Sequence, residues 1–333
     1  MRESSLLVIA LAGEGALALC SLDTASGELS QAAKTPLPGA GGVCRGMPLA
    51  ADAEGRLIYA AWRGEPFRLF SFRFDAGARS LTCIGDAGLP ASMCYAAMSS
   101  CGSHVLCASN QGSVISLSPV GAYGCAGEPV MQREAYKAHC LVEAPNGFVY
   151  ATSLRGDFVQ IYTFDGSRND LAPVSRLELS PGGGPRHIIF TRDGRRAYLL
   201  SEFAGKLDAL DVDPSTGALS VVHSVNLLSE DEKPWAAELR LGPAEDVIYA
   251  SERRSSRIYA YAAGAEGLSL LCSVQAPAVP TAFGFAQSGR YLVALGETSG
   301  EAWTYRIAPD GSLELTNRMH VGAGPSWVLE VAT

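Results

Sequence analysis

The stretch Asp193–Glu202, DGRRAYLLSE, decides the fold of this chain. A polar turn with glycine opens it, a short apolar run centred on a tyrosine follows, and polar residues close it. Glycine gives the backbone the freedom that a tight turn needs, and a short apolar run bounded by turn residues is typical of a buried strand. A similar pattern, opened by a glycine or acidic turn and centred on tyrosine, leucine or valine, recurs at Glu54–Arg63, Cys101–Asn110, Asn146–Ser153, Ala244–Arg253 and Ser288–Ala294.

Equivalent residues of these runs lie 44 to 51 residues apart, and an earlier copy is centred on Val8. Further turns at Gly27, Gly217, Gly267 and Gly311 divide the repeats into about four strands each. Seven four-stranded units of about 47 residues account for all 333 residues, and a repeat of this kind is typical of a β-propeller blade. A pair of β-sandwiches would not keep one motif at a fixed period.

We therefore predict an all-β fold, a seven-bladed β-propeller of four-stranded antiparallel blades, built as a single domain over residues 1–333. The ring should be closed by pairing of the last strand, 326–331, with strands from the N-terminus. Residues 129–138 are predicted to hold one short helix.

Composition limits the partners of the protein. The chain has 26 Lys and Arg against 34 Asp and Glu, a net charge of −8, and 47% of its residues are hydrophobic. Such a chain folds rather than staying disordered, and it lacks the basic excess expected for binding nucleic acid. No apolar run approaches the roughly 18 residues of a membrane-spanning helix. The oligomeric state stays open.

The nine cysteines show no CxxC pair and several lie in apolar runs, so we expect free thiols in a reducing, cytoplasmic compartment. Cys140 is expected to pack between blades. The N-terminal apolar run Leu6–Ala10 is expected to be a strand rather than a signal peptide, because Gly13-Glu14 interrupts it.

Blade geometry indicates where a site would lie. The loop leading into the innermost strand and the loop leaving the next strand reach the same face of a propeller. Their polar residues should therefore meet at one mouth of the central channel. A buried charge needs a partner or a ligand, so this clustering indicates a binding site or, alternatively, ion pairs between blades such as Arg186–Glu202. The residues of these loops include Arg45, Arg63, Asn110, Lys137, His139, Ser153, Arg186, His187, Glu202, Trp235, Glu238, Glu252, Arg253, Thr281 and Glu297.

Other chemistries lack support in the sequence. His139 and His187 lie far apart in the chain, no HExxH motif is present, and no GxSxG nucleophile motif occurs. Gly182–Gly184 precedes no helix, so it is expected to be a turn rather than a phosphate-binding loop. We predict neither a metal nor a cofactor.

Several stretches resemble one family. Gly184-Pro185-Arg186-His187, Trp235-Ala236-Ala237-Glu238, Gly322–Val328 and Trp62–Arg68 are similar to segments of the seven-bladed propeller lactonases of the bacterial 6-phosphogluconolactonase type. The likeness spans essentially the whole chain. The fold also includes a fungal carboxymuconate cyclase and lactonases of other sugar acids, so the resemblance implies the chemistry better than the substrate.

The resemblance implies a catalytic cluster of His139, Arg186, Glu202 and Arg253. Glu202 is expected to act as base or water-orienting group, the arginines as carboxylate and oxyanion binders, and His139 as proton donor to the ring oxygen. The roles of Glu202 and His139 are interchangeable at this point. The substrate-binding residues are expected to be His187, Arg63, Arg155, Lys137, Glu252, Trp235 and Asn110.

The expected activity is hydrolysis of a sugar-acid lactone, with 6-phosphogluconolactone as the first substrate. An aldonolactone or aldarolactone is the alternative, because Glu252 stands where many members have asparagine, Thr281 where many have arginine, and Ser153-Leu154-Arg155 in place of Asp-Leu-Gly. A muconate-type cycloisomerase and a non-catalytic scaffold are further alternatives.

Overall fold

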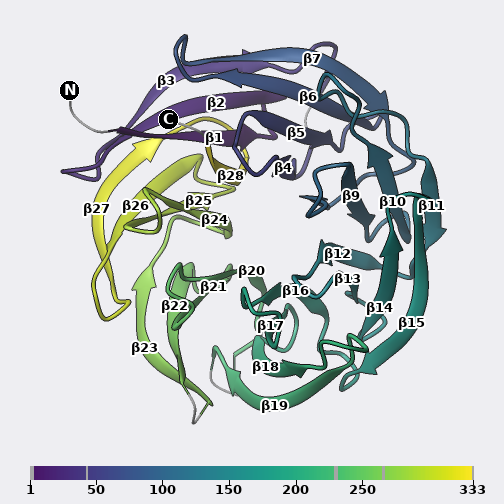
Figure 1. Ribbon diagram of the computed structural model, residues 1–333. Coiled ribbons are helices and arrows are strands. Elements are labelled where there is room, and N and C mark those ends of the chain that lie inside the picture. Colours follow the sequence, from purple (N-terminus) through teal and green to yellow (C-terminus); the bar gives the residue numbers. More distant parts are fainter. Residues whose placement is uncertain (1–3, 43, 229–231, 265–266, 332–333) are drawn as a thin grey trace.

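The computed structural model describes residues 4–42, 44–228, 232–264 and 267–331, and within them the chain forms strands and no helix. Seven four-stranded antiparallel sheets stand in a ring around a central channel (Figure 1). The predicted seven-bladed β-propeller is confirmed. Since these residues hold no helix, none of them forms one that is long and apolar enough to cross a membrane.

The innermost strand of each blade borders the channel and contacts the innermost strands of the neighbouring blades. His187–Phe190 lies in one of them. These strands are β4 (Leu49–Ala51), β8 (Tyr95–Met98), β12 (Ala138–Glu143), β16 (Pro185–Phe190), β20 (Ala236–Leu241), β24 (Pro280–Ala286) and β28 (Pro325–Val331).

The second strand of each blade is the repeated apolar run, and it is almost entirely buried because neighbouring blades cover both of its faces. Its tyrosines also join blades: the hydroxyls of Tyr59, Tyr150 and Tyr249 donate to backbone carbonyls in the next blade at 2.9–3.0 Å. The second strands are β1 (Ser4–Leu11), β5 (Leu57–Trp62), β9 (His104–Ser109), β13 (Phe148–Ser153), β17 (Arg196–Ser201), β21 (Val247–Glu252) and β25 (Tyr291–Gly296).

The two outer strands of each blade follow, and the outermost alternates between half-buried and exposed residues. The third strands are β2 (Ala16–Asp23), β6 (Arg68–Asp75), β10 (Val114–Pro119), β14 (Phe158–Asp165), β18 (Lys206–Val212), β22 (Arg257–Gly264) and β26 (Glu301–Ile307). The outermost are β3 (Leu29–Pro36), β7 (Ser80–Gly88), β11 (Met131–Glu134), β15 (Asp170–Glu178), β19 (Leu219–Asn226), β23 (Gly267–Gln275) and β27 (Leu313–His320).

The pairing of the chain ends and the outermost strand β11 test two of the sequence predictions. Strand β28 pairs with β1, with Val331 opposite Leu6 and Trp327 opposite Ala10, so the predicted ring closure is confirmed. The helix predicted for residues 129–138 is wrong: β11 lies there, paired with β10. Residues 131–134 alternate between half-buried and exposed, and this period of two suits an edge strand.

Candidate active site at one mouth of the channel

The site begins with a backbone irregularity that recurs in five consecutive blades. Where β12, β16, β20, β24 and β28 start, the pairing with the second strand of the blade shifts register. The skipped residues are His139, Arg186, Ala237 with Glu238, Thr281 and Ser326. A β-bulge adds a residue to one strand and changes the direction of its side chain. The bulges therefore set the direction of polar side chains where the innermost strands begin.

A buried ionic cluster lies at these bulges. The Glu202 carboxylate follows β17, and its Oε2 lies 3.0 Å from Arg186 Nε and 3.0 Å from Arg253 Nη2. Its other oxygen, Oε1, accepts a hydrogen bond of 3.1 Å from Trp235 Nε1. All three charged residues are more than nine-tenths buried. Arg186 and Glu202 belong to one blade, so this pair does not join two blades as predicted; the pair with Arg253 does.

Arg253 is fixed from several sides. Its guanidinium stacks on the Trp235 ring, 4.1 Å from the centroid, and donates to the backbone carbonyls of Trp235 and Ala236. Burial and the nearby Arg186 guanidinium lower the pKa of Arg253 to about 10. The group therefore keeps its positive charge at neutral pH.

A second buried pair, His187 and Glu238, holds the Arg186 guanidinium in place. Arg186 Nη1 donates to His187 Nε2 at 2.9 Å, and His187 Nδ1 lies 3.0 Å from Glu238 Oε1. This arrangement assigns the imidazole proton to Nδ1. Burial and Arg186 lower the pKa of His187 to about 4, so the ring is neutral. Burial by itself raises the pKa of Glu238, but Arg240 and His187 outweigh it and lower that pKa to about 2.

His139 lies next to this network, its ring centroid 5.3 Å from that of His187. It is buried, and its Nδ1 has no hydrogen-bond partner among the described residues. Burial, then Arg186 and further cationic neighbours, lower the pKa of His139 well below its usual value. The result is a neutral imidazole with a buried ring nitrogen that lacks a partner in the described ranges, a state that native structures usually avoid.

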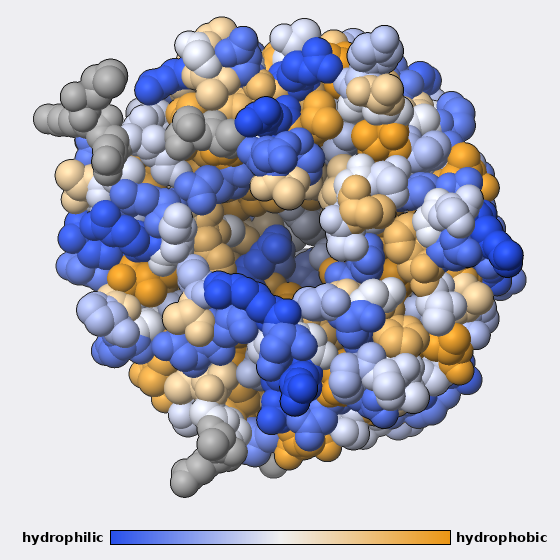
Figure 2. All heavy atoms as spheres, viewed as in Figure 1, coloured by the Kyte–Doolittle hydropathy of each residue, from blue (hydrophilic) through white to orange (hydrophobic). Residues whose placement is uncertain are grey.

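A hollow of about 820 Å³ adjoins the cluster through Trp235. Arg45, Glu297, His320 and Glu14 also line it, so its wall carries both signs of charge. The volume is within the usual range for a small-molecule site. On the face drawn in Figure 2 the disc is also hollowed at its centre, where the channel opens.

The remaining predicted substrate contacts have varied surroundings. Arg63 donates to Ser92 Oγ at 3.0 Å and to the Arg45 carbonyl at 2.7 Å. Arg155 is exposed and stacks on Phe203, Lys137 is half-buried in a left-handed backbone conformation, and Asn110 Oδ1 is buried with no partner in the described ranges. None of these contacts joins the ionic cluster.

Glu252 serves the protein itself. It is fully buried: Oε1 accepts the Trp235 backbone N–H at 2.6 Å, and Oε2 accepts the N–H and hydroxyl of Ser255 at 2.6 and 2.7 Å. With both oxygens bonded within the protein, the carboxylate positions Trp235 and has no free oxygen for a substrate.

Sequence reasoning gave no role to two neighbours of the site. Glu238 is one of the residues that the sequence places at the mouth, and its contact with His187 Nδ1 shows that it orients the imidazole. The Tyr95 ring packs edge-on against His187, with centroids 5.5 Å apart, and against Trp327. No local signal marks Tyr95, because its blade lies two blades away in the chain from that of His187. Cys140 is buried against Ile188 of the next blade, as expected.

In the part of the chain that the structure describes, no three His, Cys, Asp or Glu side chains gather as metal ligands would. The chemistry that this arrangement supports is that of fixed guanidinium groups beside a neutral imidazole.

Comparison with known proteins agrees with this architecture. The 6-phosphogluconolactonases of Pectobacterium carotovorum and Sodalis glossinidius are 28% and 29% identical to this chain, each over 86% of it and over 88% and 89% of their own lengths. The periplasmic gluconolactonase of Pseudomonas aeruginosa has a TM-score of 0.89 at 22% identity, covering 99% of both chains. A protein from Lactobacillus plantarum has a TM-score of 0.89 at 19% identity, covering 99% of this chain and 100% of its own.

These two structures show the fold. The profile of the family described as lactonase, 7-bladed beta-propeller, matches residues 7–330. The resemblance noted from the sequence is confirmed, and the chain belongs to the seven-bladed β-propeller lactonase family.

Proposed function

We propose that the protein hydrolyses the lactone of a sugar acid at the cluster of His139, Arg186, Glu202 and Arg253, with 6-phosphogluconolactone as its first substrate and 6-phosphogluconate as the product. One observation carries the proposal: two buried guanidinium groups share one carboxylate beside a neutral imidazole with an unsatisfied nitrogen. The names of the curated relatives support the substrate.

The arginines receive the lactone carbonyl. Arg186 Nη2 and Arg253 Nη1 make no hydrogen bond within the described ranges, whereas their other nitrogens hold Glu202 or backbone carbonyls. Donors fixed before the reaction stabilise an oxyanion without reorganising. These two groups therefore bind the carbonyl oxygen as it gains negative charge, and Glu202 keeps them in place.

His139 is the better general base. Both Glu202 oxygens are already occupied by Arg186, Arg253 and Trp235. The neutral His139 ring takes a proton from water as the water oxygen attacks the carbonyl carbon. When the bond between that carbon and the ring oxygen breaks, the imidazolium gives its proton to the departing oxygen, and the open hydroxy acid results.

The rest of the substrate occupies the hollow beyond Trp235. Arg45 on its wall offers a charge partner for a phosphate group. Glu297, on the same wall and bonded to Thr281 Oγ1 at 2.8 Å, favours hydroxyl groups instead. This second observation keeps an unphosphorylated aldonolactone or aldarolactone as the alternative substrate.

We also propose that the enzyme works in the cytoplasm. All nine cysteines lie in the described ranges and none forms a disulfide. Free cysteines are the usual state of proteins in a reducing compartment.

The test compares freshly prepared 6-phosphogluconolactone, gluconolactone and galactarolactone, with spontaneous hydrolysis subtracted. We expect the phosphorylated lactone to give the highest kcat/KM, and Arg45→Ala to lower it for that lactone alone. Equal or faster opening of the other two would reject the phosphorylated substrate but keep the lactonase. No hydrolysis above background would reject the proposed function.

A further inference from the structure

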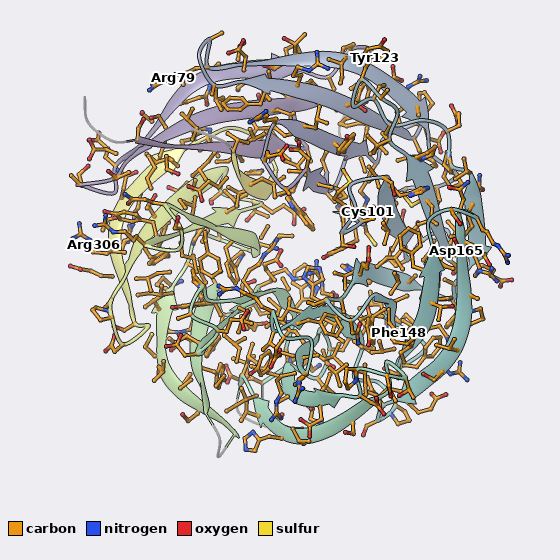
Figure 3. The ribbon with its side chains drawn as sticks, in the orientation of Figure 1. Arg79, Cys101, Tyr123, Phe148, Asp165 and Arg306 are labelled. Atoms are coloured by element: carbon orange, nitrogen blue, oxygen red, sulfur yellow. The ribbon has the colours of Figure 1, made fainter. Side chains whose placement is uncertain are left out.

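A second cluster of reactive groups lies at the opposite ends of the strands from the candidate site. The turn between β8 and β9 carries Cys101 and Ser103, and β9 begins at His104. The candidate site lies beyond the other ends of the second strands, so the two clusters occupy opposite faces. Cys101 lies beside the central opening in Figure 3. All nine cysteines are in the described residues, and only Cys101 is exposed.

The cluster is a continuous chain of short contacts. Cys101 Sγ lies 2.9 Å from Ser103 Oγ, which lies 2.8 Å from His104 Nδ1. His104 Nε2 lies 2.7 Å from Asn169 Oδ1, in the turn between β14 and β15 of the next blade. A nucleophile within reach of a base, with a third group orienting the base, is the general pattern of an activated nucleophile.

The direction of the hydrogen bonds follows from Asn169. An amide oxygen only accepts, so His104 Nε2 carries a proton and Nδ1 of the neutral ring accepts one. Ser103 then donates to His104 and accepts from the Cys101 thiol. Shifting one proton along each contact gives a thiolate, a bridging serine and an imidazolium, with every hydrogen bond retained.

The surroundings keep this base in place. His104 is buried and packs edge-on against Phe164, with ring centroids 5.7 Å apart. The hydroxyls of Ser103, first, and of Ser99 lower the pKa of the Cys101 thiol. Burial instead raises the pKa of Cys20, Cys107 and Cys140 to about 12.

We propose that Cys101 is a thiol–disulfide exchange site, which takes up half of a low-molecular-weight disulfide. The Cys101 thiolate attacks one sulfur of the disulfide, a new S–S bond forms to Cys101 and the old one breaks. Cys101 sulfur is oxidised and the departing thiolate is reduced. The proton held at His104 passes through Ser103 to the departing thiolate, so the relay returns to its starting state.

The test uses the intact protein at neutral pH with oxidised glutathione, followed by peptide mass spectrometry, and with iodoacetamide as a second electrophile. We expect Cys101 to be the first residue modified by both. A lower thiol pKa raises the thiolate fraction about tenfold per unit and costs about threefold in nucleophilicity, a net gain of about threefold. Ser103→Ala should therefore slow the reaction of Cys101, by about threefold for each unit by which the thiol pKa rises, and move its pH midpoint upward.

Ser100→Ala is the matched control. Ser100 lies in the same turn but bonds to Glu143, with Oγ–Oε1 at 2.6 Å, and not to the relay. This variant should react like the wild type. Modification of the half-buried Cys125 or Cys272 as fast as Cys101 would overturn the proposal. Equal effects of Ser103→Ala and Ser100→Ala would also overturn it.

Discussion

Replacing Glu202 with glutamine tests the ionic cluster most directly. The substitution keeps the size of the side chain and removes the charge that Arg186 and Arg253 share at 3.0 Å each. Two guanidinium groups, both more than nine-tenths buried, then face each other without a counter-charge. Removing one partner of a buried ion pair costs about 3–5 kcal/mol of unfolding free energy.

The expected change in melting temperature follows from the size of the chain. An unfolding entropy of about 2.1 cal/mol/K per residue gives about 0.7 kcal/mol/K over the 333 residues. The melting temperature should then fall by about 4–7 °C, as measured by calorimetry or circular dichroism. At a temperature well below melting, kcat/KM for the lactone should fall at least about a hundredfold, because the oxyanion donors lose their fixed positions.

Asp211→Asn is the matched control for stability. Its pair with Arg196 has a similar distance, 3.1 Å, but the two side chains are 54% and 42% exposed. An exposed pair contributes about 0–1 kcal/mol, so this variant should melt within about 1.5 °C of the wild type and keep full activity. If Glu202→Gln melts like the control, the ionic cluster does not stabilise the fold as argued. If it melts early but keeps its kcat/KM, the cluster is structural and the catalytic assignment is wrong.

Three further outcomes are expected. His139→Gln should lower kcat/KM at least about a hundredfold, and wild-type activity should stay level from pH 8 to pH 6 because the pKa of His139 is lowered; a half-loss near pH 6.5 would contradict this. The free energy of unfolding should be highest above pH 6.5 and fall as the pH drops towards 4. His187 has a pKa of about 4 in the folded protein, so the unfolded chain protonates this imidazole at a higher pH than the folded one does. The free energy of unfolding should fall further between pH 4.5 and 2, where Glu238 becomes protonated. Thermal melts at a series of pH values measure both losses, and equal stability at pH 7 and pH 4 would refute the role of His187. Dialysis against a chelator should leave lactone hydrolysis unchanged, and activity restored only by calcium or zinc would refute the metal-free mechanism.

The sequence determined the number and kind of blades because that information is local. Each turn glycine and each short apolar run, such as Ala197–Ser201, specifies its own hairpin, and the fixed period counts the blades. It also placed Arg186, Glu202 and Arg253 at one mouth, because strand order alone puts these loop positions on one face. At Met131–Glu134 the local alternation of half-buried and exposed residues suits the edge strand that stands in place of the predicted helix.

Only the tertiary structure decided how the side chains at that mouth meet. A strict alternation along a strand cannot predict the bulges at His139 and Arg186, because a bulge depends on pairing with the neighbouring strand. The same holds for Glu252, which the sequence offered as a substrate contact but which bonds within its own turn and to Trp235. Hydrogen bonds and ion pairs act over about 3 Å, and which groups come within that distance is set by the closure of the whole ring.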